Sequence, residues 1–597
     1  MSSKPKKNHP WLTNYPVDVD WHAKLDTKSM NDVFDSSVKK YAHNTFINFL
    51  GTKYSFKEVS NMVDRMAKNL QDQGVKKGSK IGLALPNSPF YIVAYYAILK
   101  TGATVVNLNP LYPEDQMEEL IKDSETEMVF TLDLNTMYPK ISNLVNKDNK
   151  LKKIISCDMA TELPFGKKML FKLAGLLGKT GQLKTKNDPN TLSYKNLLED
   201  NGKPTKVEVD PENDVAVFQF TGGTTGIPKA AMLTHKNLTA NTQQAEMWFT
   251  NMEPGKEKFL AVLPFFHVFA MTVEMNMSLQ TGTEMVILPR PETDKILEAV
   301  KKEKPTIFAG VPTMYQDLNT FKDIKKYDLS SLKACISGGA ALSKDIKADF
   351  EKLSGCTLFE GYGLSETSPI ATANPVDATR QKTGTIGLPM PQTKIKLMDL
   401  EFPDKEAKIG FKGEICIQGP QVMKGYWKRP DATKESTTKD GYFRTGDIGI
   451  MDDQGYVTIV DRLKDMIITG GFNVYPSKVE KAIREHDAIE EVIVDGVKDD
   501  RQGESVKAYI VLKEGKSLTQ DELKAFLKEK LAGYERPRLV EFRKDLPRTM
   551  IGKPDKKALR EEEAKKAFNS SAKNSNVAND NPQPSALNKK APNKGPK

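Results

Sequence analysis

The chain contains few cysteines, and none of them stands at a spacing typical of a metal site or a redox pair. The four are Cys157, Cys335, Cys356 and Cys416. Because they lie far apart in the sequence, the pattern predicts neither a zinc site nor a disulfide framework. Unpaired cysteines are typical of a reducing compartment, so we expect a cytoplasmic protein.

Long apolar runs are also missing. The longest, Phe90–Leu99, has about half the length that a helix needs to cross a bilayer. The segment Met1–Pro10 is polar and basic, and it lacks the apolar region of a signal peptide. The sequence therefore predicts a protein that is soluble or peripherally bound to a membrane.

No nucleic-acid-binding motif is present either, and the excess of positive charge is small. The chain has 597 residues and a formal net charge of +10, with 28% charged and 39% hydrophobic residues. This composition is normal for a soluble globular protein, and the length is too great for a single hydrophobic core. Mild positive charge suits nucleotides, CoA or an anionic membrane surface. We expect several packed units and no nucleic-acid partner.

From about residue 80 onward, apolar runs of strand length alternate with helical patterns. Lys80–Leu85 and Ala103–Leu108 are predicted strands, and Pro89–Lys100 between them is a predicted helix. Asn87 and Ser88 stand where the N-cap of that helix is expected. Such alternation predicts an α/β fold with largely parallel sheets in layers.

Three later regions depart from this alternation. The stretch 410–455 is rich in Gly and in charged residues, and it predicts antiparallel strands and turns. After Arg462, the helical and strand-like patterns are typical of a small α+β domain. The tail after Ala567 is rich in Asn, Ser, Pro and Lys and has almost no large apolar side chains, so we expect it to be disordered.

One stretch, Leu163–Lys186, combines apolar residues at helical spacing with flanking lysines. This pattern is typical of a helix that lies in a membrane interface, which would place the protein at the inner face of the cytoplasmic membrane. A surface helix packed on the domain explains the same pattern. Gly175, Gly178 and Gly181 disfavour a helix of either kind, so both interpretations stay open.

The run Thr221–Lys229 follows a predicted buried strand, Val215–Phe220. Its three glycines and three threonines cannot pack a core, but they can direct N–H groups and hydroxyls at a compact anion, and Lys229 adds a positive charge. The run is not a Walker A loop, because Ile227 and Pro228 separate the last glycine from the lysine. Taken alone, it is equally consistent with an ordinary polar loop.

This run resembles the phosphate loop of the adenylate-forming superfamily, which includes acyl-CoA synthetases, luciferases and the adenylation domains of peptide synthetases. Other segments resemble further motifs of that superfamily in the same order along the chain. They are the aromatic–His segment Pro264–His267, the adenine and magnesium motifs Ser337–Ala340 and Gly361–Thr367, the ribose motif Thr445–Asp447, the hinge Asp461–Asp465 and the catalytic-lysine loop Pro547–Lys553. Within the superfamily, Asp440–Gly449 and Gly471–Pro476 are most similar to bacterial long-chain fatty acid–CoA ligases.

The resemblance covers roughly residues 30 to 565 and implies a large N-terminal domain and a small mobile C-terminal domain. The large domain would consist of layered α/β subdomains and a β-rich subdomain, and it would bind AMP and carry out adenylation. The implied boundaries are 1–460 for this domain, 461–464 for the hinge, 465–566 for the α+β lid domain and 567–597 for the disordered tail.

The reaction that the resemblance implies activates a fatty acid in two steps. The carboxylate attacks the α-phosphorus of ATP to give an acyl-adenylate and pyrophosphate, and the thiol of CoA then displaces AMP. Because these steps bring anions together, the site needs cations, N–H donors and Mg²⁺ at the phosphates. The implied partners are fatty acid, ATP and CoA, and a monomer and a homodimer both stay open.

The resemblance assigns a role to each residue that matches a motif. Lys553 would bridge the carboxylate and the α-phosphate during adenylation, His267 would position the carboxylate, and Lys464 would be the hinge residue. Glu366, with Thr224, would hold Mg²⁺, since a carboxylate is a hard oxygen ligand. The implied acyl-pocket residues are Phe265, Phe266, Phe269 and Met271. The implied nucleotide-binding residues are Thr221, Gly222, Gly223, Thr224, Thr225, Gly226, Lys229, Gly338, Gly339, Ala340, Gly361, Tyr362, Gly363, Ser365, Asp447 and Arg462.

Each of these residues also has an ordinary structural interpretation when it is taken alone. A single Glu or Lys is usually solvated, and a His or an apolar stripe in this setting usually belongs to a core. Two other functions stay open: a fatty acyl-AMP ligase that loads a carrier protein, and a non-catalytic acyl- or nucleotide-binding protein at a membrane. The presence of Lys229, Glu366, Asp447 and Lys553 argues against the second.

Overall fold

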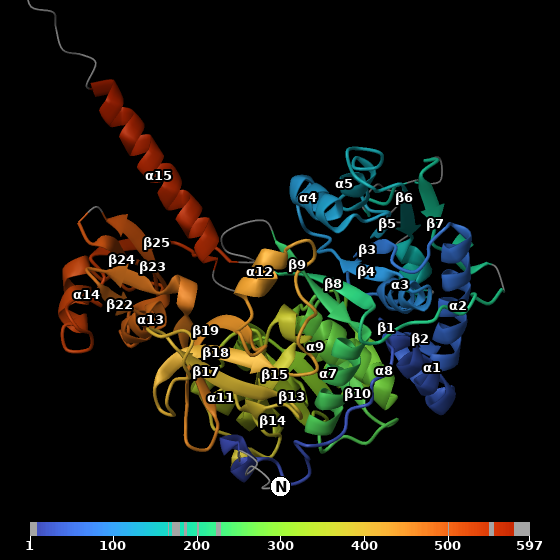
Figure 1. The fold of residues 1–597 in the computed structure, drawn as a ribbon, viewed down its shortest axis with the longest axis horizontal. Coiled ribbons are helices and arrows are strands. Elements are labelled where there is room, and N and C mark those ends of the chain that lie inside the picture. The colour runs from blue at the N-terminus through green and yellow to red at the C-terminus, as the bar shows by residue number, and fades with distance from the viewer. Residues whose placement is uncertain are drawn as a thin grey trace, which may run out of the picture. The chain divides into compact units, whose positions relative to one another are not determined.

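The computed structural model describes residues 9–164, 166–169, 180–183, 185, 188–199, 202–221, 228–499, 501–548 and 555–577, with side chains in the last range only as far as 566. The chain divides into two compact units, Met1–Lys464 and Asp465–Lys597 (Figure 1). The division falls at the end of the predicted hinge, whose role as a hinge stays a prediction. No helix among the described residues has the length and apolarity that crossing a bilayer requires.

A seven-stranded sheet of the first unit carries the phosphate-loop hairpin at one edge. Its strand order is β7-β6-β5-β3-β4-β8-β9, and all neighbours are parallel except β8 and β9. The strands are β3 (Lys80–Ala84), β4 (Thr104–Asn107), β5 (Met128–Leu132), β6 (Lys153–Cys157), β7 (Thr191–Ser193), β8 (Val215–Thr221) and β9 (Lys229–Thr234). The parallel arrangement confirms the fold class predicted from alternating apolar runs.

A second, nine-stranded sheet has the order β16-β15-β14-β13-β12-β10-β11-β1-β2. Its central strands are parallel, and β2, β15 and β16 pair in the antiparallel sense. The strands are β1 (Thr45–Phe49), β2 (Thr52–Ser55), β10 (Lys258–Ala261), β11 (Glu284–Ile287), β12 (Ile307–Gly310), β13 (Ala334–Ser337), β14 (Thr357–Gly363), β15 (Ile370–Ala373) and β16 (Leu388–Pro389). The predicted adenine and magnesium motifs follow β13 and β14, so the ends of parallel strands carry them.

Helices cover these sheets, and one of them is buried from its first residue to the last but one. Helix α3 (Pro89–Lys100) packs on β3, β4 and α2, and every residue of Phe90–Leu99 is at most 2% exposed. The longest apolar run of the sequence is therefore a core helix. The other α-helices whose bounds are described in this unit are α1 (Met30–Tyr41), α2 (Phe56–Asp72), α4 (Glu114–Ser124), α5 (Tyr138–Ser142), α7 (His235–Trp248), α8 (Met277–Thr281), α9 (Thr293–Glu303), α10 (Pro312–Thr320), α11 (Lys344–Ser354) and α12 (Pro430–Glu435).

The stretch predicted to be β-rich forms a four-stranded antiparallel sheet. It contains β17 (Lys394–Asp399), β18 (Lys412–Gln418), β19 (Phe443–Met451) and β20 (Val457–Arg462) in sequence order. Glycines permit its tight turns and close approaches, as at Gly446, which has a φ of +71° directly before Asp447.

The second unit has its own apolar core and an α+β content, as predicted. Its strands are β21 (Ile467–Thr469), β22 (Phe472–Val474), β23 (Ile489–Asp499), β24 (Gly503–Leu512) and β25 (Leu539–Arg543), and its helices are α13 (Pro476–Arg484), α14 (Gln520–Leu527) and α15 (Lys556–Val577). Helix α15 enters the region predicted to be a disordered tail. Extending a formed helix costs far less than nucleating one, and no Gly or Pro interrupts this segment.

The stretch Leu163–Lys186 is described only in part. Met169 is 56% exposed, and Gln182 fastens the end of the stretch by donating to Asp133 and to Asp158 at 2.9 Å each. The apolar residues that suggested a membrane-interface helix lie outside the described residues, so contact with a membrane stays a prediction.

Candidate nucleotide and acyl site

The hairpin β8–β9 frames the predicted phosphate loop. Thr221, the last residue of β8, pairs with Lys229, the first residue of β9. The residues between them therefore connect the two strands at this end of the hairpin. β8 is parallel to β4, and this end is therefore the carboxyl end of a parallel strand, where α/β sheets commonly bind ligands. Gly222, Gly223, Thr224, Thr225 and Gly226 lie outside the described residues, so their roles stay predictions.

A distant segment pairs with the other edge of β9. Met232 donates to the carbonyl of Gly425 at 2.9 Å, Lys424 donates to that of Met232 at 3.0 Å, and Trp427 donates to that of Ala230 at 2.9 Å. This antiparallel pairing brings Tyr426 beside Lys229, whose Nζ lies 5.3 Å from the centre of the tyrosine ring. A cation at this distance from an aromatic face is attracted to it.

Tyr426 also contacts the predicted metal ligand. Its hydroxyl donates to Glu366 Oε1 at 2.8 Å, and Glu366 is only 9% exposed. Burial raises the pKa of Glu366 above its ordinary value, and the hydrogen bond from Tyr426 acts in the opposite direction. Tyr426 therefore links the predicted metal ligand to the lysine at the end of the phosphate loop.

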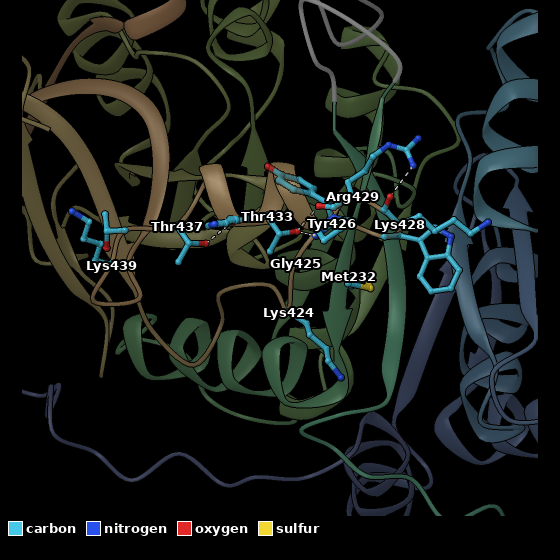
Figure 2. Close-up of a pocket in the computed structure, with 13 residues that line it drawn as sticks. Met232, Lys424, Gly425, Tyr426, Lys428, Arg429, Thr433, Thr437 and Lys439 are labelled. Atoms are coloured by element: carbon cyan, nitrogen blue, oxygen red, sulfur yellow. Dashed lines mark hydrogen bonds between the residues drawn. The ribbon is translucent and has the colours of Figure 1, made fainter. Parts of the chain in front are cut away.

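Tyr426 is one of the residues that line a surface pocket of about 910 Å³ (Figure 2). The pocket is lined by residues of the segment that pairs with β9 and by residues from α12 onward, including Lys424, Arg429 and Thr433. Of the described residues predicted to form the nucleotide site, none lines it. Arg429 and Lys428 are already engaged by Asp123 at 2.7 Å and by Glu125 at 3.0 Å.

The predicted adenine and ribose residues meet around Asp447. Tyr362 at the end of β14 donates to Asp447 Oδ2 at 2.6 Å, and Arg462 Nε lies 3.2 Å from Oδ1. Asp447 and Arg462 are cross-strand partners in β19 and β20. Asp447 is 4% exposed, whereas the side chain of Arg462 is 49% exposed. Burial raises the pKa of Tyr362, and the negative charge of Asp447 raises it further. The Tyr362 hydroxyl therefore remains a hydrogen-bond donor at neutral pH.

Among the described residues, no three His, Cys, Asp or Glu side chains cluster as a metal site. A magnesium ion held by Glu366 would therefore take its other ligands from phosphate oxygens, water or the loop. A buried carboxylate with a fixed orientation suits this role, because Mg²⁺ is usually bound by one or two carboxylates and by substrate phosphates. Glu366, the described ligand, is therefore compatible with a bound Mg²⁺ ion.

Gly338 packs against Phe269, two residues after the aromatic–His segment. A Cβ atom there would lie 2.9 Å from Phe269 Cε1, so only glycine lets the ring approach β13 this closely. Gly339, which follows, is exposed with a φ of +84°, and Ala340 is exposed as well. In the next motif, a Cβ at Gly363 would collide with the carbonyl oxygen of Pro369. Gly338 and Gly363 thus serve close packing within the protein, whereas Gly339 serves a backbone turn.

Side chains from elsewhere hold the backbone before His267. Asn87 donates to the carbonyl of Leu263 and accepts from the N–H of Phe265, both at 2.8 Å. His267 is half-buried, and its Nδ1 accepts from the N–H of Phe269 at 3.3 Å.

The four predicted acyl-pocket residues divide into two pairs. Phe265 and Met271 are fully buried in the core of the first unit, and Phe266 and Phe269 are half-buried. The first pair matches the ordinary interpretation of an apolar stripe, so Phe266 and Phe269 are the better candidates for a wall that an acyl chain touches.

The catalytic-lysine loop belongs to the second unit. Asp555 donates its N–H to the carbonyl of Pro547 at 2.8 Å and so closes the base of the loop, while Lys553 lies outside the described residues. Arg560 in α15 binds Asp495 at 2.7 Å and Asp465 at 2.9 Å, which fastens the helix after the loop to the start of the unit. The hinge candidate Lys464 lies in a short helical turn, Leu463–Asp465.

Comparison with known proteins agrees with this geometry. Residues 34–427 match the model of the AMP-binding enzyme family, and residues 478–553 match that of the AMP-binding enzyme C-terminal domain. The chain belongs to the AMP-binding enzyme family. It is 40% identical over 560 residues to a long-chain-fatty-acid–CoA ligase of Bacillus subtilis (strain 168), covering 93% of this chain and 98% of that relative. It is 36% identical to a protein of the same name from Escherichia coli O157:H7, with 94% and 99% covered.

Solved structures of the same fold are also similar. ATP-bound MatB from Rhodopseudomonas palustris matches with a TM-score of 0.76 and 28% identity, over 89% of this chain and 99% of that one. The anthranilate–CoA ligase AuaEII in complex with anthranoyl-AMP matches with the same TM-score of 0.76 at 24% identity, which supports the fold alone. The resemblance seen in the motifs is confirmed, and the role of each motif residue stays a prediction.

Replacing Gly338 with Ala should strain the contact between the end of β13 and Phe269. The added Cβ would lie 2.9 Å from Phe269 Cε1, so the ring must shift, and overpacking of this kind commonly costs about 1–3 kcal/mol of stability. We expect a lower midpoint of denaturant unfolding, and a smaller loss when Phe269→Leu is also present. Gly166→Ala is the control, because nothing lies within 4 Å of a Cβ there. An unchanged midpoint for Gly338→Ala would show that the ring does not constrain this position.

Proposed function

We propose that the chain is an ATP-dependent, AMP-forming long-chain fatty acid–CoA ligase of the cytoplasm. The observation that carries this proposal is the 40% identity to a long-chain-fatty-acid–CoA ligase over nearly the whole length of both chains. The described site supports it, because Glu366, Asp447, Tyr362 and Arg462 are held in place by one another or by Tyr426. Fatty acid, ATP and CoA are the proposed substrates.

The first half-reaction forms the acyl-adenylate. A carboxylate oxygen attacks the α-phosphorus of ATP, the new P–O bond forms, and pyrophosphate leaves. Thr221 and Lys229, with the loop between them, would hold the pyrophosphate end. Asp447 would accept hydrogen bonds from the ribose hydroxyls, and Arg462 would donate to the nucleotide. A bound Mg²⁺ ion supplies positive charge at the phosphate oxygens, and Glu366 and Thr224 would hold it.

The second half-reaction transfers the acyl group to the CoA thiol. The sulfur attacks the acyl carbon, the bond to the adenylate oxygen breaks, and AMP leaves. Because CoA brings its own thiol, the chain needs no catalytic cysteine. All four cysteines are buried, which agrees with this assignment.

A pyrophosphate-release assay with palmitate and ATP, with and without CoA, tests the proposal. Rapid steady release that depends on CoA, with palmitoyl-CoA as the product, is the expected result. Steady release only in the presence of an acyl-carrier protein would favour a fatty acyl-AMP ligase. Absence of release under every condition would favour a non-catalytic binding protein.

Replacing Lys553 with Ala should affect the two half-reactions unequally. The ammonium group is proposed to stabilise charge only while the carboxylate attacks, and the loss of one such group commonly costs about two to three decades in rate. We expect that loss in adenylate formation and little change in thioester formation from supplied palmitoyl-adenylate. Lys557→Ala is the control, because Lys557 is an exposed lysine of α15. An equal loss in both half-reactions would contradict the assignment of Lys553.

Replacing Tyr426 with Phe should weaken the binding of the metal. The change removes the donor to Glu366 Oε1 and keeps the ring beside Lys229. Groups that orient a metal ligand commonly contribute about tenfold or more to metal affinity, so we expect a loss of that size in Mn²⁺ binding measured with a non-hydrolysable ATP analogue. Tyr442→Phe is the matched control, since Lys396 lies 4.3 Å from the ring of Tyr442. Unchanged Mn²⁺ affinity in Tyr426→Phe would show that the hydroxyl does not orient the metal ligand.

The acyl site should favour long apolar acids. The first charged residue after the aromatic–His segment, Glu274, is fully buried, and burial raises its pKa well above the ordinary value. Such a neutral acid offers no positive partner to a second carboxylate. Each buried methylene contributes about 0.8 kcal/mol, so kcat/KM should rise severalfold per carbon until the pocket is full. We expect this trend across saturated acids from acetate to stearate. A maximum at acetate, or at an aromatic acid, would overturn the long-chain assignment.

A further inference from the structure

Gln219 lies between two parts of the site that the sequence motifs describe separately. It belongs to β8, two positions before Thr221, and it is 5% exposed. Asn107 of β4 and Ala231 of β9 are its cross-strand partners. Its backbone is therefore fixed in the strand that carries the phosphate loop.

Both ends of the Gln219 side-chain amide are engaged. Nε2 donates to the carbonyl of Phe266 at 3.1 Å, and Oε1 accepts from Asn107 Nδ2 at 2.9 Å. Asn107 Oδ1 in turn accepts from the hydroxyl of Tyr91 at 2.6 Å, and that hydroxyl also lies 3.0 Å from the carbonyl of Phe265. A chain of hydrogen bonds thus leads from Tyr91 to Asn107, from Asn107 to Gln219, and from Gln219 to the carbonyl of the residue before His267.

The backbone from Leu263 to Phe266 belongs to no strand or helix, so its polar groups need side-chain partners. Asn87 engages Leu263 and Phe265, Tyr91 engages Phe265, and Gln219 engages Phe266. Asn87 and Tyr91 come from the start of α3, whereas Gln219 alone among these partners comes from the strand that leads into the phosphate loop. Among these described side chains, the Gln219 amide joins β8 directly to this backbone.

We propose that Gln219 is a positioning residue that fixes the aromatic–His segment relative to the carboxyl end of β8. Adenylation joins a carboxylate oxygen, which His267 is proposed to orient, to the α-phosphorus of a nucleotide held at the end of β8. Rates of such reactions fall steeply when the two reactants are misplaced, by about a hundredfold for a shift near 1 Å. This inference rests on the proposed function, since it assigns Gln219 to the adenylation step.

Gln219→Glu tests the proposal without changing the size of the side chain. One carboxylate oxygen can still accept from Asn107, but the other faces the carbonyl of Phe266 without a proton to donate. Protonation restores the donor, and burial raises the pKa of a carboxyl group. We expect palmitoyl-adenylate formation to fall by about a hundredfold at about pH 9 and to recover toward about pH 6, relative to the wild type at each pH. The pKa of the nearby Tyr91 is raised well above this range by burial.

The chain offers a closely matched control in Gln244 of α7. Gln244 is also fully buried, its Nε2 donates to the carbonyl of Pro391 at 2.6 Å, and its Oε1 accepts from Asn241 Nδ2 at 2.8 Å. Gln244→Glu should therefore lower the unfolding midpoint much as Gln219→Glu does, but it should not produce a rate that recovers at low pH relative to the wild type. The comparison separates positioning from a general effect on the fold.

A second variant, Gln219→Met, keeps the volume and removes both polar functions. We expect a similar loss of rate with no recovery at low pH, and nearly unchanged binding of a non-hydrolysable ATP analogue, which also shows that the protein is folded. Equal behaviour of Gln219→Glu and Gln244→Glu, or full activity of Gln219→Met, would overturn the proposal. Wild-type turnover of palmitate is measured in the same series, so a failure of the proposed function would appear there and a failure of this inference only in the variants.

Discussion

The antiparallel pairing of β9 with residues 424–427 is the constraint on which the described part of the site depends. Three backbone hydrogen bonds join the strand that begins at Lys229 to a segment far along the chain. They place Tyr426 where its ring meets Lys229 and its hydroxyl meets Glu366. Because Glu366 follows a strand of the other large sheet, this one pairing connects the phosphate-loop hairpin, the second sheet and the loop before α12. The cation and the carboxylate that would face the phosphates are thus fixed relative to each other.

Much of the fold was predictable because burial leaves a local pattern in the sequence. The run Pro89–Lys100 was predicted as a helix and is α3, and the apolar runs at Lys80 and Val215 were predicted as strands and are β3 and β8. Tyr362, Asp447 and Arg462 were found through motif resemblance, and the structure brings them within hydrogen-bond or ion-pair distance. The roles of these three residues in binding a nucleotide stay predictions, as do those of His267, Lys464 and Lys553.

The residues that sequence analysis missed act through long-range contacts. Gln219 stands in a strand-like run, and Tyr426 stands in a stretch rich in glycine and charged residues. Nothing near either residue in the sequence identifies Phe266 or Glu366 as its partner. Asn87 shows the limit most clearly, because its position before α3 predicts a helix cap. The structure gives the cap position to Ser88, which makes no side-chain cap bond, and uses Asn87 to hold Leu263 and Phe265. The helix-cap rule thus drew attention to Asn87 but assigned its side chain to the wrong partner, because tertiary contacts outweigh local preference.

The two buried carboxylates of the site, Glu366 and Asp447, each accept a hydrogen bond from a tyrosine hydroxyl. This arrangement explains how a buried negative charge can still bind a ligand. Glu366 accepts from Tyr426 at 2.8 Å, and Asp447 accepts from Tyr362 at 2.6 Å. A neutral hydroxyl fixes the orientation of a carboxylate without cancelling its charge, whereas a buried ion pair would leave little field for a metal ion or a ribose hydroxyl. The side chain of Arg462, which contacts Asp447, is half exposed, so water weakens its attraction for the carboxylate. Burial raises the pKa of Glu366, and the hydrogen bond from the Tyr426 hydroxyl opposes that rise. Each tyrosine hydroxyl donates to only one oxygen of its carboxylate. Each carboxylate is therefore held in a fixed orientation and keeps one oxygen that is not engaged by a tyrosine, which suits a ligand such as a metal ion or a ribose hydroxyl.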